Sequence, residues 1–169
     1  MKEKDELLQI FPTPVLITKY GNSIDDEFKF IEKLRYIEQK ENGNFKSDDT
    51  YLLKHNELAL IKNFIYESLN KFTKNIFHTK QRLVVTQCWT NKNPPNSKHH
   101  EHVHPNSIVS GVFYFRQTKT LPPIQFNKSI QDGVKLSPEK YNQLNSETFL
   151  LPMVDGELVL FPSSLRHSV

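Results

Sequence analysis

The stretch KHHEHVHPNSIVSGVFYF, residues 98–115, places four of the chain's seven histidines within six positions. Three of them, His100, His102 and His104, alternate with other residues. A β-strand directs alternate side chains to the same face, so this spacing predicts imidazoles gathered on one face of a sheet. Residues 108–115 are rich in β-branched and aromatic residues and predict the next strand.

A further histidine, His167, ends the stretch LVLFPSSLRH of residues 158–167. We expect His102, His104 and His167 to meet and to hold one divalent metal, because neutral imidazole is a common ligand for first-row metals. Three protein ligands on one face leave coordination positions open for a substrate, whereas a closed set of four is typical of a structural site. From the residues alone, the histidines are equally explained as polar surface groups.

The other histidines and Glu101 are weaker candidates. His99 and His100 are interpreted as polar neighbours of the site, and direct ligation by either one is left open. His55 and His78 are expected at helix ends or on the surface. Glu101 is out of phase with the alternating histidines, so we do not expect it to be a ligand.

Length and composition are those of a globular protein of one domain. The chain has 169 residues, and its net charge of +3 comes from lysines that are spread along the sequence. This pattern predicts a solvated surface, and we expect neither a nucleic-acid partner nor a membrane partner. Cys88 is the single cysteine, which favours a reducing compartment. We therefore expect a cytoplasmic protein (in the host cytoplasm if it is viral), and a homodimer stays open.

The order of the predicted elements indicates an α+β fold. Apolar residues at helical spacing predict one helix from Ser23 to about Leu34 and a second from about Glu57 to Phe77. Polar residues with Asn, Gly or Pro predict loops at residues 41–50 and 91–97. The predicted strands are residues 8–17, 83–90, 100–104, 108–116, 124–126, 148–151, 157–161 and 165–169, with a turn at Asp155-Gly156. Helices followed by short strands predict a single domain over residues 1–169, with helical support over about 1–80 and a sandwich or barrel over about 81–169.

Several blocks of the sequence resemble a family of small, mostly uncharacterised 2-oxoglutarate/Fe(II) oxygenases of bacteria and their viruses. The blocks are IFPTPV at residues 10–15, WTN at 89–91, HVHPNS at 102–107, SGVFYF at 110–115 and GELVLFPSSLRH at 156–167. The resemblance extends over nearly the whole chain, and the ordered set of blocks is more specific than any one motif.

The resemblance implies a double-stranded β-helix, or jelly-roll barrel, with supporting helices on one side. It implies Fe(II) as the metal, 2-oxoglutarate as co-substrate, and O₂. By motif match, His102, His104 and His167 would be the catalytic metal ligands, while Asn91, Tyr114 and Arg116 would bind the co-substrate. The implied reaction hydroxylates an unidentified small-molecule or peptidyl substrate and releases succinate and CO₂.

Two departures from the family pattern leave alternatives open. The carboxylate of the usual two-histidine, one-carboxylate set is a histidine here, so the preference among Fe, Ni and Zn is undecided. The family also places an arginine or lysine after the distal histidine, whereas this sequence stops at Val169. Either a C-terminal piece is absent or another cation serves, for which Arg82, Arg116 and Arg166 are the candidates.

A cupin-type metalloenzyme and a non-catalytic jelly-roll binding or structural module are the alternative functions.

Overall fold

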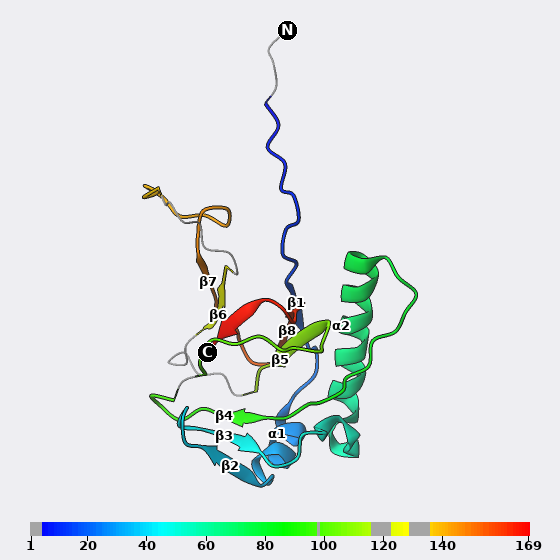
Figure 1. The fold of residues 1–169 in the computed structure, drawn as a ribbon. Coiled ribbons are helices and arrows are strands. Elements are labelled where there is room, and N and C mark those ends of the chain that lie inside the picture. The colour runs from blue at the N-terminus through cyan, green and yellow to red at the C-terminus, as the bar shows by residue number, and fades with distance from the viewer. Residues whose placement is uncertain (1–4, 98, 116–122, 129–135) are drawn as a thin grey trace.

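The computed structural model describes residues 5–97, 99–115, 123–128 and 136–169 of the chain. Within these ranges, short antiparallel strands outnumber the two α-helices, so the predicted α+β class is confirmed (Figure 1). The helices are α1 (Asp25–Glu32) and α2 (Ala59–Phe77). Two short 3₁₀ helices, Leu52–Lys54 and Asn56–Leu58, precede α2. No helix in the described ranges is long and apolar enough to cross a membrane.

Strand β8 (Glu157–Pro162) lies at the centre of the fold, between β1 (Leu16–Lys19) and β5 (Val109–Phe113). Its leucines, Leu158 and Leu160, pack with Leu69 and Phe72 of α2. Its alternate residues, Val159 and Phe161, face the opposite side and enter a second core cluster. Because both faces of β8 are buried, its sequence is continuously apolar and does not alternate with polar residues.

A second sheet packs against that opposite side of β8. It has the order β7–β6–β9, with β7 at Thr148–Leu151, β6 at Ile124–Asn127 and β9 at Arg166–Ser168. Phe126 of β6 and Phe161 of β8 meet edge to face, with ring centroids 5.1 Å apart. The predicted strands at 108–116, 124–126, 148–151, 157–161 and 165–169 are therefore confirmed for their described residues, and Gly156 adopts a φ of 76° in the predicted turn.

The third sheet, β2–β3–β4, lies at the bottom of the view in Figure 1. It consists of β2 (Tyr36–Gln39), β3 (Asn44–Ser47) and β4 (Asn91–Lys92). The prediction of loops at 41–50 and 91–97 was wrong for β3 and β4. The strands are polar and their hydrophobic alternation is weak, so only the turn residues before β3, including Gly43 with a φ of 70°, gave a signal.

Two further strand predictions were wrong in extent. Residues 83–90 form no ladder; within them, Cys88 makes an isolated bridge to Tyr51. Leu83 and Val85 instead pack against the helical part of the core, which explains their apolar alternation. The opening strand is restricted to Leu16–Lys19, because Pro12 and Pro14 have no N–H to donate to a neighbouring strand.

Candidate metal centre

His167 is the buried member of the site. It lies on β9, directly opposite Phe126 of β6, and its side chain is only 4% exposed. Its ring packs against Phe161 of β8, with centroids 4.7 Å apart. The neighbours Arg166 and Ser168 alternate to the other face of β9. The apolar pattern that builds the core thus also directs this imidazole inward.

The segment that carries His102 and His104 is not the regular strand that the sequence predicted. It is attached to β9 by a pair of backbone hydrogen bonds, from His102 N to His167 O at 3.0 Å and from His167 N to His102 O at 3.1 Å. His104 N donates to Ser163 O at 3.0 Å. The segment ends at Pro105, which has no N–H to donate. His102 and His104 are therefore held at the edge of β9 without a continuous ladder.

His100 does not point toward the same centre, contrary to the alternation argument. Its side chain is exposed, and its Nδ1 lies 2.9 Å from the side-chain oxygen of Asn42. Because the segment is not a regular strand, alternate residues do not all face one way. His55 hydrogen-bonds to Asp49, and His78 ends α2 in a left-handed conformation, so both are outside the site as predicted.

Three of the four remaining imidazoles converge; the fourth, His99, has its Nε2 3.1 Å from Asn44 Nδ2 and 2.9 Å from Asn93 Oδ1. One ligand atom from each of His102, His104 and His167 lies within 4.8 Å of the others. The ring centroids are 4.9 Å apart for His102 and His104, 4.3 Å for His102 and His167, and 5.1 Å for His104 and His167. Metal–nitrogen bonds are about 2 Å long, so one ion can bridge the three rings after small side-chain movements.

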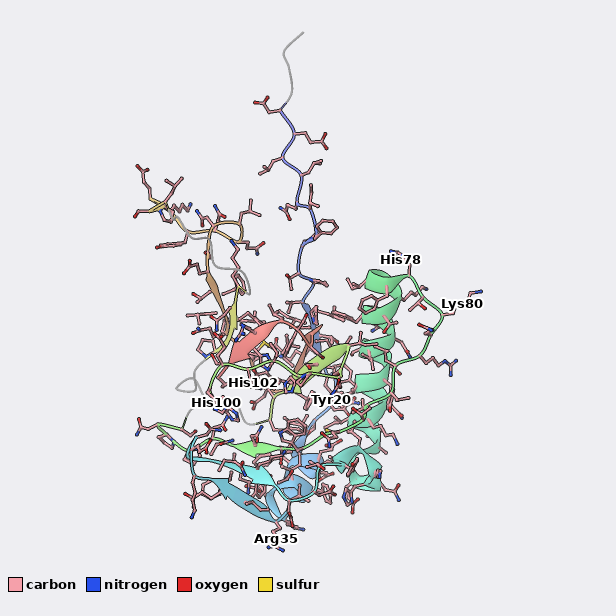
Figure 2. The ribbon with its side chains drawn as sticks, in the orientation of Figure 1. Tyr20, Arg35, His78, Lys80, His100 and His102 are labelled. Atoms are coloured by element: carbon pink, nitrogen blue, oxygen red, sulfur yellow. The ribbon has the colours of Figure 1, made fainter. Side chains whose placement is uncertain are left out.

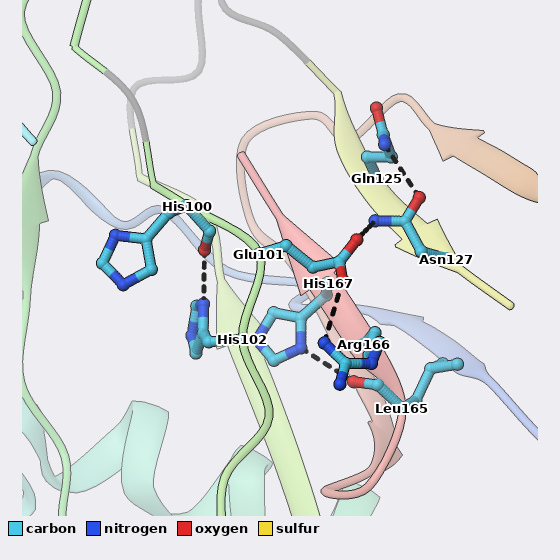
Figure 3. Close-up of polar contacts among 8 residues, drawn as sticks. All are labelled: His100, Glu101, His102, Gln125, Asn127, Leu165, Arg166 and His167. Atoms are coloured by element: carbon cyan, nitrogen blue, oxygen red, sulfur yellow. Dashed lines mark hydrogen bonds and ion pairs between the residues drawn. The ribbon is translucent and has the colours of Figure 1, made fainter. Parts of the chain in front are cut away.

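Two backbone carbonyls fix the tautomers of this cluster, as Figure 3 shows. His102 Nδ1 donates to His100 O at 2.8 Å, and His167 Nδ1 donates to Leu165 O at 3.0 Å. A carbonyl only accepts, so each Nδ1 carries the proton and each Nε2 keeps a free lone pair. Such partners orient metal-ligating histidines and strengthen them as ligands.

Burial favours the neutral form of His104 and His167. It lowers the pKa of His167 to about 4; the hydrogen bond to Leu165 O opposes this shift, and the neighbouring histidines add to it. Burial, and then His102, also lowers the pKa of His104. Since a metal binds the unprotonated imidazole, both residues are in the ligating form at neutral pH.

Glu101 and Arg166 face away from the cluster and bind each other. Arg166 Nη1 donates to Glu101 Oε1 at 3.0 Å, and the second oxygen of Glu101 accepts from Asn127 (Figure 3). Both carboxylate oxygens of Glu101 are therefore engaged outside the histidine cluster. The side chain of Arg166 is engaged outside the site.

The other residues that the sequence predicted for the site do not belong to the histidine cluster. Tyr114 is buried in the core with Val159 and Phe161, and its hydroxyl has no hydrogen-bond partner among the described residues. Asn91 lies on β4 and is exposed, and Arg82 is exposed as well. Arg116 lies outside the described residues.

Sequence reasoning missed Trp89 as a neighbour of the cluster and Lys46 as a neighbour of Trp89. Trp89 lies with its ring centroid 6.4 Å from that of His104, and Lys46 Nζ stands 4.3 Å above the Trp89 ring. Trp89 was noticed only as part of a motif, and Lys46 lies in the stretch predicted to be a loop. No periodic signal in that stretch relates it to the histidines.

Residues 87–169 match the model of a family described as "Putative 2OG-Fe(II) oxygenase". This match confirms the resemblance to that family for residues 87–169. The matched segment contains all three histidines of the cluster, together with Asn91 and Tyr114, whereas Lys46 lies before it. No curated protein matches the chain with significant similarity.

Proposed function

We propose that the protein is a 2-oxoglutarate- and Fe(II)-dependent dioxygenase that hydroxylates a small molecule or a peptidyl residue. One observation carries the proposal: His102, His104 and His167, from two segments far apart in the chain, offer ligand atoms within 4.8 Å of one another. The family match over residues 87–169 supports the assignment of Fe(II) and 2-oxoglutarate to this cluster.

His102, His104 and His167 would hold the metal through three ring nitrogens on one side, which leaves positions for other ligands. When bound there with 2-oxoglutarate and O₂, Fe(II) would supply the oxidation of a substrate C–H bond to C–OH, with release of succinate and CO₂. The carbonyls of His100 and Leu165 hold two of the rings in the ligating tautomer. Phe161 and Phe126 cover the inner side of His167 and exclude water from it.

Tyr114 and Asn91 are proposed to contact the co-substrate. The Tyr114 hydroxyl is buried without a partner among the described residues, and a buried donor left unpaired is costly. A carboxylate oxygen from a ligand between the two sheets would accept that hydrogen bond. Asn91 lies on β4 as the cross-strand partner of Lys46 and offers an exposed amide to a ligand.

The fold proposal follows from the same region. Antiparallel β1–β8–β5 and β7–β6–β9 face each other across the core of Val159, Phe161 and Phe126. We propose that these sheets are the two halves of a double-stranded β-helix, with α2 covering the outer side of the first. The family match and the facing antiparallel sheets support this assignment.

The direct test is succinate release by protein loaded anaerobically with Fe(II) and then supplied with 2-oxoglutarate and O₂. We expect release by the wild type and by His100→Ala, whose exposed ring lies outside the cluster although its backbone carbonyl is kept. We expect none from His102→Ala. Absence of succinate from wild-type protein that demonstrably holds iron would contradict the proposed function.

A further inference from the structure

Lys46 is a half-buried cation that ring contacts connect to the metal centre. Its Nζ stands 4.3 Å from the centre of the Trp89 ring, and that ring lies 6.4 Å from the ring of His104. The distance from the Lys46 ammonium group to the His104 ring centre therefore has an upper limit, which is the Lys46–Trp89 distance added to the Trp89–His104 distance. The indole face attracts a cation and holds its position while leaving its N–H groups available to another acceptor.

The register of β3 shows that Lys46 faces the histidine segment. Asn44 and Lys46 are two residues apart on this strand and share a face. On that face the Asn44 side-chain nitrogen lies 3.1 Å from His99 Nε2, next to the cluster, and Asn91 is the cross-strand neighbour of Lys46. Figure 2 shows His100 and His102 above β4, on the side toward the other two sheets.

The charge of Lys46 is not balanced by any carboxylate in the described ion pairs. Two other described cations near the site are less suited to bind a ligand there. Arg166 is bound to Glu101 and faces the opposite side of β9 from His167. Lys92, on β4, stands 4.0 Å above the Tyr36 ring, but it pairs in register with Phe45 and so lies on the other face of the same sheet.

We propose that Lys46, held over Trp89, binds a carboxylate of the ligand that occupies the histidine centre. This inference rests on the proposed function. One source of the carboxylate is the far end of 2-oxoglutarate, whose four carbon–carbon bonds span about 5 Å when extended. The other source is an acidic group on the second substrate. In both cases, a charge-assisted hydrogen bond forms between the ammonium group and the carboxylate.

The experiment measures equilibrium binding by calorimetry to protein loaded with Ni(II), which accepts imidazole ligands and does not support turnover. The first arm compares 2-oxoglutarate with pyruvate, which lacks the far carboxylate. The second arm titrates glutarate, as a carboxylate probe, into protein already saturated with 2-oxoglutarate. The variants are Lys46→Ala, Lys46→Arg and the matched control Lys92→Ala. Ni(II) affinity is measured first and is expected to be equal in all of them, because no lysine is a metal ligand.

If the far carboxylate of 2-oxoglutarate is the partner, Lys46→Ala weakens 2-oxoglutarate binding about 10- to 100-fold and leaves pyruvate binding unchanged. If an acidic second substrate is the partner, Lys46→Ala leaves 2-oxoglutarate binding unchanged and abolishes glutarate binding. Lys46→Arg restores the affected affinity to within a few-fold of the wild-type value, since arginine keeps the charge and also stacks on indole. Lys92→Ala behaves as the wild type in either case.

The inference is overturned if Lys46→Ala matches the wild type in both arms while the wild type binds 2-oxoglutarate, and the proposed function then stands. A wild type that binds Ni(II) but neither 2-oxoglutarate nor glutarate overturns both. Failure to bind Ni(II) at all contradicts the histidine site itself and, with it, the inference that depends on that site.

Discussion

The two sides of the histidine cluster are built differently. His167 lies on β9, inside a paired sheet, and is 4% exposed. His102 and His104 are only half-buried and lie on a segment that meets β9 through one pair of backbone hydrogen bonds at His102 and meets Ser163 through a single one at His104. One candidate ligand is thus fixed by the core, whereas the other two depend on a few contacts at the edge of the sheet.

This difference indicates how the site is prepared for a metal. The core determines the position, tautomer and neutral state of His167 before any ion binds. The His102–His104 segment contributes the adjustable side, because it has fewer backbone hydrogen bonds and is nearer to solvent. A metal would therefore order the segment more than the strand. The predictions below test this asymmetry.

The largest effect is expected from removing the fixed ligand. His167→Ala should weaken Ni(II) binding by more than about 100-fold, because even the loss of a supporting partner of a metal ligand costs about 10- to 100-fold. Calorimetric titration of the metal measures this affinity, and circular dichroism verifies that the variant is folded.

The matched control for that titration is His100→Ala, which removes an exposed imidazole from the same segment and retains the carbonyl that binds His102. Its Ni(II) affinity should equal that of the wild type. If His100→Ala and His167→Ala lose affinity equally, the ligand set is not the one inferred from the structure.

The second prediction concerns hydrogen exchange in the segment around His102. Saturation with Ni(II) at about 100 times its dissociation constant stabilises the bound state by about 2.7 kcal/mol. Amides whose exchange requires opening of the site, such as those of His102 and His104, should then exchange up to about 100-fold more slowly. Amides of β8 should change less, since its residues are already buried on both faces. Equal slowing in both regions would remove the distinction between the two sides.

The sequence predicted the histidine cluster and parts of the fold correctly where the spacing of residues in the chain matches their burial in the structure. His102 and His104 were predicted from their alternation and His167 from its motif, and all three meet in the structure. Helix α2 and strand β8 were predicted because each has an apolar pattern matched to its packing. The alternation of His102 and His104 and the apolar patterns of α2 and β8 are local, and a local signal is sufficient for them, whereas the meeting with His167 joins distant segments.

The missed features depend on contacts between distant residues. Lys46 lies in a polar stretch, and only the pairing of β3 with β4 and the position of Trp89 bring it to the histidines. Residues 83–90 have the composition of a strand but no continuous partner in the described part of the chain, because Leu83 and Val85 pack against the helical core. Pairing partners are not encoded in the local period of a segment.

The third prediction concerns Gly111→Ala, a substitution that disturbs the sheet behind His167 without altering a histidine. A Cβ at Gly111 of β5 would lie 2.6 Å from Leu160 Cδ2 and 3.0 Å from Val159 O. Leu160 is buried against α2, so it cannot move aside without cost. Gly111→Ala should therefore lower the free energy of unfolding by about 1–3 kcal/mol, measured by urea denaturation.

Gly21→Ala provides the control for that measurement, because a Cβ at Gly21 would have no atom within 4 Å. Its unfolding free energy should lie within about 0.5 kcal/mol of the wild-type value. A Gly111→Ala protein as stable as Gly21→Ala would show that the close approach of β5 to β8 is relieved without strain.

The smallest effect is expected at the outer face of β9. The ion pair between Arg166 and Glu101 joins the strand to the His102 segment, but both side chains are nearly half exposed, at 49% and 42%. Exposed pairs contribute about 0–1 kcal/mol, so Arg166→Ala should change the free energy of unfolding by less than about 1 kcal/mol. It should also leave the binding of 2-oxoglutarate to the Ni(II)-loaded protein unchanged, because Arg166 faces away from His167. A loss of that binding with unchanged stability would identify Arg166 as the carboxylate partner and would mean that Arg166 and Glu101 separate when ligand binds.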